Sequence, residues 1–117
     1  MACSHIPDHL FETENGVVLR CDQCGWFNVL FGPVVLANDR DGFKELRDLI
    51  VSLEPQEGAA HHASDRRYQL HTANRQIGLA FTEAEVEELR DLLNGAAAMD
   101  ELDGLLDDAL GSSGDTL

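Results

Sequence analysis

Two segments of the chain share the same order of apolar and polar positions. When residues 33–50 are laid over residues 76–93, seven of eighteen positions are identical. In both, a short apolar run typical of a strand precedes apolar residues at three- and four-residue intervals, which are typical of one helical face. The helical positions that coincide are Phe43, Leu46, Leu49 and Ile50 in the first copy and Val86, Leu89, Leu92 and Leu93 in the second. The pattern predicts an internal repeat.

The first unit is expected to be a hairpin followed by a helix. The hairpin spans residues 26–37, with its turn at Gly32–Pro33. Its strands are apolar on both sides, which predicts a central place in a sheet or, alternatively, a subunit contact. The helix is expected to begin at Asn38–Asp39 and to end at about Glu54, because Pro55 disfavours helical geometry in the residue before it.

The second unit repeats this order with clearer signals. Its hairpin spans residues 67–81 around Ala73–Asn74. The side expected to be buried carries Tyr68, Leu70, Ile77, Leu79 and Phe81. Thr82 and Glu85 predict a capping box, in which each side chain accepts a hydrogen bond from the other residue's backbone amide. Asn94–Gly95 is a natural stop for this helix.

Together the units predict an α+β domain over residues 1–95, with repeat units at about 16–54 and 67–95. The hairpins are expected to pair into one mainly antiparallel sheet with both helices packed against it. Residues 96–117 are expected to form a separate acidic amphipathic helix with a frayed end, which docks weakly through its leucines.

The charge of the chain narrows the range of partners. The net charge is −14, and the segment from Glu83 to Leu117 holds eleven acidic residues against one Arg90. Such a field repels phosphate backbones, so we expect no nucleic-acid partner. The acidic helix predicts a basic protein partner, and its alternative role is only to keep the protein in solution. The two-sided apolar hairpin leaves a homodimer as a further alternative.

Membrane insertion and export are not expected. The longest apolar runs fall far short of the roughly 20 residues that span a bilayer. The first residues lack a basic start followed by a long apolar run, so no targeting segment is indicated. The chain has three cysteines, an odd number that disfavours a disulfide framework. These features predict a cytoplasmic protein.

Residues 21–25 read "CDQCG" and carry the clearest chemical signal. A zinc knuckle needs two thiolates on a tight turn so that both reach one ion at roughly 2.3 Å. The glycine behind the second cysteine eases the torsion of that turn. The pair lies between the expected strand at 16–21 and the strand that begins at Trp26, where ribbon-type zinc sites place their knuckles.

Cys3 and His5 are expected to complete the site with Cys21 and Cys24, giving a closed Cys3His zinc site. His9 competes with His5 for the fourth position. With four protein ligands the ion has no open position for water or substrate, so we expect a structural zinc and no enzyme activity.

Two other interpretations of the cysteines stay open. Three thiols without metal would behave as small apolar residues. A redox pair needs an attacking cysteine at a helix N-terminus, whereas here the pair is followed by a strand.

In these features the chain resembles a family of small uncharacterised bacterial proteins. The resemblance rests on the early cysteine, the C-x2-C pair, the "FG" in the apolar segment and the two hairpin–helix units, and covers residues 3 to about 95. It implies a compact, metal-clipped domain and no established activity. The positions that it carries over are Cys3, Cys21 and Cys24.

Alternative functions rest on other residues. Arg67, His71 and Arg75 could bind an anion or a small molecule and make the protein a regulator. With Arg66 they form a basic patch whose ordinary role is to pair with the acidic helix. A zinc enzyme is a further alternative if Cys3 or His5 is not a ligand and water takes its place.

Overall fold

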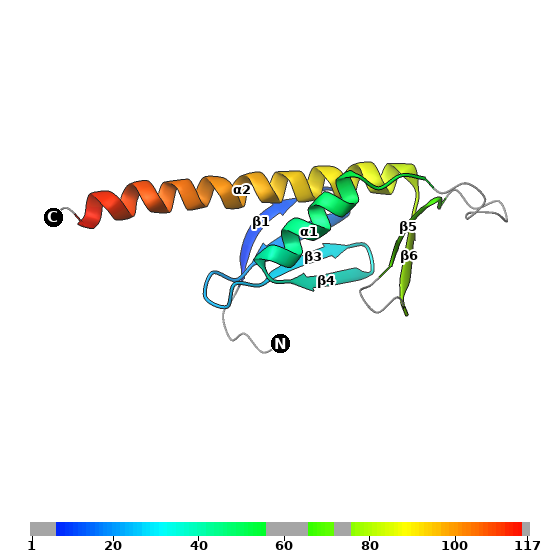
Figure 1. Ribbon diagram of the computed structural model, residues 1–117, viewed down its shortest axis with the longest axis horizontal. Coiled ribbons are helices and arrows are strands. Elements are labelled where there is room, and N and C mark those ends of the chain that lie inside the picture. The colour runs from blue at the N-terminus through cyan, green and yellow to red at the C-terminus, as the bar shows by residue number, and fades with distance from the viewer. Residues whose placement is uncertain (1–6, 56–65, 72–75, 116–117) are drawn as a thin grey trace.

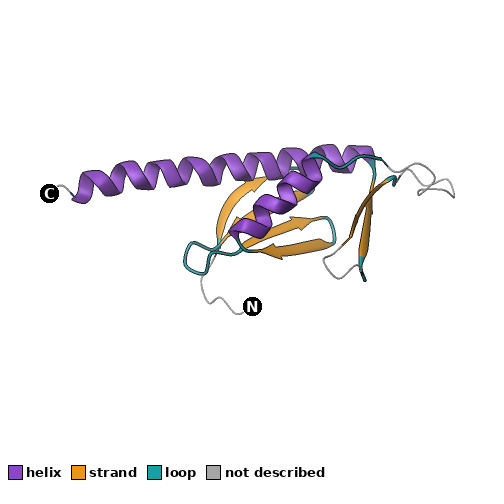
Figure 2. Ribbon diagram, viewed as in Figure 1, coloured by secondary structure: helices purple, strands orange, loops and turns teal. Residues whose placement is uncertain are grey.

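The computed structural model describes residues 7–55, 66–71 and 76–115. The elements in these ranges are β1 (Asp8–Glu12), β2 (Gly16–Arg20), β3 (Phe27–Phe31), β4 (Val34–Asn38), α1 (Arg40–Val51), β5 (Tyr68–His71), β6 (Gly78–Phe81) and α2 (Glu83–Asp115). The fold class is α+β, as the sequence predicts (Figure 1, Figure 2).

The strands form two antiparallel sheets, where the sequence led us to expect one. The larger sheet has the order β1-β2-β3-β4, and β5 pairs with β6 in a second sheet. The two hairpins meet through side chains, since the rings of Phe31 and Phe81 contact edge to face with centroids 6.2 Å apart. The strand β1, which the apolar pattern does not predict, lies at the far edge of the larger sheet, beside β2.

The first hairpin lies only partly in the middle of its sheet. Its strand β3 pairs with β2 on one side and β4 on the other, and Val29 is buried. Its other strand, β4, lies at an edge, and Val35 is 62% exposed there. The expected central position therefore holds for β3 alone.

Both helices cover one face of the larger sheet (Figure 1). Helix α2 packs against β1, β2 and α1, while α1 packs on β4 and α2. The ring of Phe27 from β3 stacks on that of Phe43 from α1, with centroids 4.6 Å apart. The buried core between the layers also includes Val18, Val29, Ile50, Tyr68, Leu70, Phe81, Val86, Leu89, Leu92, Leu93 and Ala96.

Helix α1 begins where the sequence predicts and ends earlier. Asp39 caps it by accepting a hydrogen bond from the backbone amide of Gly42 at 2.7 Å. The expected end at Glu54 is wrong, because the helix stops at Val51. The backbone amide and hydroxyl of Ser52 both bond back to carbonyls of the last turn and close it there.

The two helices do not bury equivalent faces. Leu92 is fully buried in α2, whereas Leu49, its counterpart in the sequence repeat, is 45% exposed in α1. Ile77, expected on the buried side of the second hairpin, is also exposed, because β6 begins only at Gly78. Helix α1 lies over the edge strand β4, so that less of its circumference is covered.

Helix α2 does not stop at Gly95 but continues to Asp115. A Cβ atom at Gly95 would lie 2.3 Å from the ring of Phe11 on β1, far inside contact distance. The missing side chain therefore serves close packing of the helix on β1 and not a helix end. The expected stop was wrong because glycine suits both situations.

We expect Gly95→Ala to destabilise the protein by about 1 to 3 kcal/mol, because the added methyl overpacks the contact with Phe11. Gly104→Ala is the matched control, since open space surrounds Gly104. There the higher helix propensity of alanine should stabilise the protein by up to about 1 kcal/mol. Urea unfolding measures both. Equal effects of the two substitutions would contradict the packing role of Gly95.

A carboxylate ties the β1–β2 turn to α2. Glu88 accepts hydrogen bonds from the Thr13 hydroxyl at 2.6 Å, the Asn15 backbone amide at 2.7 Å and the Asn15 side-chain amide at 2.8 Å. Burial pushes the pKa of Glu88 upward, but these hydrogen bonds outweigh burial, so its pKa lies below the ordinary value of 4.5. The ionised form of Glu88 is therefore stabilised by folding.

Because this folded pKa is depressed, the contribution of Glu88 is complete above about pH 4.5 and is lost as the pH falls through the folded pKa. Glu88→Gln should cost about 1 to 3 kcal/mol at pH 7. The difference in unfolding free energy between wild type and variant should shrink as the pH falls from about 5 through the folded pKa of Glu88, which lies below 4.5. Urea unfolding across this range measures it, with the exposed neighbour Glu87→Gln as control. A gap that does not depend on pH would contradict the assignment.

Candidate metal centre

Residues 21–25 form a tight turn between β2 and β3. The backbone amide of Cys24 donates a hydrogen bond to Cys21 Sγ at 3.3 Å. The amide of Gly25 donates to the carbonyl of Cys21 at 2.9 Å, and Gly25 has a φ of 75°, in the left-handed region that glycine favours. The amide of Cys21 donates to the carbonyl of Trp26 at 2.9 Å and closes the loop. This turn has the hydrogen bonds that suit two thiolates facing one ion.

Two of the four predicted zinc ligands lie outside the described residues. Cys21 is buried and Cys24 is exposed, while Cys3 and His5 lie outside the described residues. His9, the competitor for the histidine position, lies on β1 with its Nε2 3.0 Å from Glu12. Within residues 7–55, 66–71 and 76–115, no group of three or more His, Cys, Asp or Glu side chains could hold a metal ion. The described part of the chain thus holds three of the candidate ligands, Cys21, Cys24 and His9.

A cluster of charged residues anchors this turn to α2. Arg20 immediately precedes the turn, and its side chain is only 9% exposed. Its Nη1 donates to Asp100 at 3.0 Å and its Nη2 to Asp103 at 2.9 Å. Its Nε lies 2.9 Å from Asp22 Oδ1 without the alignment of a hydrogen bond. We call Arg20 with Asp8, Asp22, Arg40, Asp100 and Asp103 the Arg20 cluster.

The other members of the Arg20 cluster extend it to β1 and α1. Asp8 on β1 lies 3.7 Å from the Arg20 guanidinium, and Arg40 at the start of α1 pairs with Asp100. Arg40 also lies over the ring of Phe27, 5.2 Å from its centroid. Four elements, β1, β2, α1 and α2, and the cysteine turn therefore meet at one set of charges.

Opposing effects set the charge states in the Arg20 cluster. Burial lowers the pKa of Arg20, but hydrogen bonds with Asp100 and Asp103 and the nearby carboxylates raise it more, so Arg20 stays charged. A hydrogen bond with Asp8 raises the pKa of Asp22, and burial adds to this, against the attraction of Arg20. The pKa of Asp22 therefore lies above its ordinary value of 3.8.

In the part of α2 beyond Gly95, acids face the body of the protein and leucines face outward. This is the reverse of the predicted arrangement. The inward face of the helix carries Leu89, Leu93 and Ala96, then continues in phase into Asp100 and Asp103. The apolar side chains beyond Gly95 point away from the body: Met99, Leu102, Leu105 and Leu106 are 38%, 47%, 64% and 49% exposed. We call these four residues the α2 outer stripe. The expected docking of this segment through its leucines is wrong, since charge pairs hold it.

In the basic patch of the second hairpin, Arg66 pairs with the start of α2 and not with its C-terminal part. Arg66 pairs with Glu85, in the first turn of α2, where Glu85 also accepts the backbone amide of Thr82 at 2.8 Å. The amide of Glu85 donates to the Thr82 hydroxyl at 3.1 Å, so the capping box is confirmed. Burial raises the pKa of Glu85, but the bonds from Thr82 and Arg66 lower it further than burial raises it. Arg66 therefore does not anchor the end of α2.

Two of the three residues predicted to bind an anion lie in the described part of the chain. Arg67 and His71 are exposed, and Arg75 lies outside the described residues. His71 borders a groove between β4, α1 and the second hairpin that is mostly apolar, with Leu36, Leu46, Leu49, Leu70 and Leu79 in its wall. Arg67 is not among the residues that line this groove.

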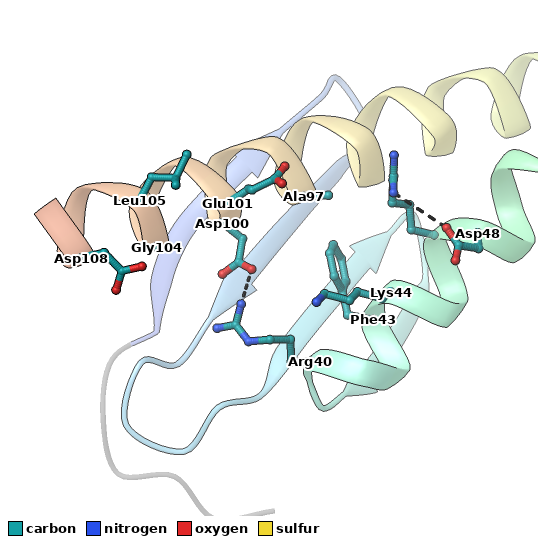
Figure 3. Close-up of a pocket in the computed structure, with 11 residues that line it drawn as sticks. Arg40, Phe43, Lys44, Asp48, Ala97, Asp100, Glu101, Gly104, Leu105 and Asp108 are labelled. Carbon is teal, nitrogen blue, oxygen red and sulfur yellow. Dashed lines mark hydrogen bonds and ion pairs between the residues drawn. The ribbon is translucent and has the colours of Figure 1, made fainter.

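A second groove lies between the two helices and was not predicted. Arg40, Lys44 and Arg47 line it from α1, and Asp100, Glu101 and Asp108 from α2 (Figure 3). Two of its cations have partners within the chain, since Arg40 pairs with Asp100 and Arg47 Nε donates to Asn94 at 2.8 Å. The spacing of three cations at i, i+4 and i+7 could have indicated this basic helical face.

These observations define a small α+β protein with a cysteine turn fixed to a long helix through a buried arginine. The chain belongs to a family of unknown function, DUF6686, whose model matches residues 3–107. Membership in an uncharacterised family agrees with the resemblance noted in the sequence, and the match does not bear on the knuckle or the repeat. No curated protein and no solved structure matches the chain. None of the helices in the described ranges is long and apolar enough to cross a membrane.

Proposed function

We propose that this protein is a non-enzymatic zinc-binding protein that acts through protein–protein contacts. The metal holds the N-terminal segment against the turn at residues 21–25, with Cys3, His5, Cys21 and Cys24 as its ligands. Its role is structural, because four protein ligands leave the ion no position for a substrate.

The observation that carries the proposal is the hydrogen bond from the Cys24 amide to Cys21 Sγ, together with the left-handed Gly25. An N–H donor aimed at sulfur stabilises the thiolate form that metal binding needs. The Arg20 cluster supports the same conclusion, because Arg20 adjoins the turn and holds it in place. Protein contact as the mode of action is supported by the exposed apolar side chains of the α2 outer stripe.

Cobalt substitution tests both the ligands and the closed shell. The protein should bind about one Co²⁺ per chain, with the thiolate charge-transfer bands and strong visible absorption of a tetrahedral site. Zinc should displace the cobalt. Adding azide should leave the spectrum unchanged, because no coordination position is open to it.

Two results would contradict parts of the proposal. A spectrum that changes on adding azide would indicate an open position and favour the zinc enzyme instead. If cobalt added to the wild-type protein gave no thiolate bands, and the spectrum of Cys21→Ser were the same, the cysteine turn would not be a metal site.

A further inference from the structure

We infer that the α2 outer stripe is the docking surface for a basic amphipathic helix of a partner protein. This inference rests on the proposed mode of action through protein contacts, and it names the class of partner. Its starting point is the arrangement of α2 beyond Gly95, where acids face the body and leucines face outward.

The outer stripe has the spacing of a helix-pairing seam. Met99, Leu102 and Leu106 follow one another at intervals of three and four residues, and Leu105 widens the seam on one side. In a helix, such positions line one face and meet the apolar face of a second helix. The exposed fractions of 38% to 64% leave all four side chains open to contact.

The seam is held in a position that a partner can reach. The molecule is 65 Å long and 26 Å across, and the C-terminal half of α2 extends past the sheet at the end opposite the second hairpin (Figure 1). Arg20 and Arg40 form ion pairs with Asp100 and Asp103 on the inner face of this half. The same contacts that hold the helix thereby orient its leucines outward.

Charge selects the class of partner. Exposed acids flank the seam on both sides, with Asp107 on one and Glu101 and Asp108 on the other. From Asp91 to Leu117 the sequence has seven acids and no Lys or Arg. A helix with leucines on one face and Lys or Arg along its borders matches both the seam and its rims.

A second copy of the chain fits this surface poorly. Pairing two outer stripes would bring acidic rims of the same sign together in a chain of net charge −14. Two cations of the neighbouring helix α1 are already engaged, since Arg40 pairs with Asp100 and Arg47 donates a hydrogen bond to Asn94.

The test uses two synthetic helical peptides with the same leucine seam, one bordered by lysines and the other by glutamates. We expect the full-length, metal-loaded protein to bind the lysine peptide and not the glutamate peptide, measured by fluorescence anisotropy. Leu102→Gln with Leu106→Gln should weaken binding about tenfold or more, because the apolar contact is lost without a change in charge. Glu101→Gln with Asp108→Asn should weaken it and reduce its dependence on salt.

Ile77→Gln is the matched control, since Ile77 is 58% exposed and lies outside α2. It should leave binding unchanged, and circular dichroism should show each variant folded. Three results would overturn the inference: no binding of the lysine peptide, binding that the leucine variant does not weaken, or a dimer in sedimentation that the leucine variant dissociates. The cobalt spectrum judges the zinc proposal separately, so failure of the docking surface leaves that result standing.

Discussion

Cys24→Ser should lower the melting temperature by at least about 10 °C and abolish the response of the protein to chelator. Structural zinc contributes apparent binding free energies of about 10 to 16 kcal/mol in small peptides, while whole domains are stable by only about 5 to 15 kcal/mol. Cys24 is exposed, so serine there removes little packing, and a large loss must come from the ligand. Thermal unfolding with and without chelator, under reducing conditions, measures the effect.

Gln23→Ser is the matched control, because Gln23 is an exposed residue of the same turn and not a candidate ligand. It should melt like the wild type. Cys3→Ser should resemble Cys24→Ser if the N-terminal segment completes the site. Wild type and Cys24→Ser with the same melting temperature, each unaffected by chelator, would refute a structural metal.

The parts of the fold that the sequence predicts correctly depend on neighbours along the chain. The capping box needs only Thr82 and Glu85, and both of its hydrogen bonds are present. The turn at residues 21–25 likewise follows from cysteine spacing and Gly25, whose φ of 75° is a local property. Such features can be predicted because no distant residue decides them.

Gly95 shows why other predictions failed. Its sequence context suits a helix end, and only the ring of Phe11, brought close by the packing of β1, makes it an interior position. The separation of the two sheets is a similar case, because side-chain contact between Phe31 and Phe81 replaces the expected backbone pairing. Long-range packing decided both outcomes.

Long-range packing also explains why the Arg20 cluster was not predicted from the sequence. Arg20 and Asp100 are 80 residues apart, and nothing near either residue indicates the other. One signal was present: Asp100 and Asp103 continue the helical phase of Leu89, Leu93 and Ala96. A buried face that changes from apolar to acidic predicts a buried cation opposite it.

Arg20→Met should destabilise the protein by about 2 to 4 kcal/mol, because it removes a buried guanidinium and leaves the partly exposed carboxylates of Asp100 and Asp103 without it. This lies toward the lower part of the range for broken buried pairs, since Asp103 is 39% exposed and Arg40 still reaches Asp100. Methionine keeps most of the volume of the side chain, so the loss reports charge and hydrogen bonds more than packing. Urea unfolding at neutral pH measures it, and the exposed Arg67→Met controls for removing one positive charge from an acidic protein.

Hydrogen exchange distinguishes an anchor of α2 from a general contribution to stability. If Arg20 anchors the outer half of α2, Arg20→Met should speed amide exchange more at residues 97–109 than at residues 86–93, which the apolar core holds through Val86, Leu89 and Leu92. Adding Asp103→Asn to Arg20→Met should recover part of the lost stability, because one uncompensated charge is removed with its partner. A uniform increase in exchange along α2, or no recovery in the double variant, would show that Arg20 does not hold this half of the helix through its acids.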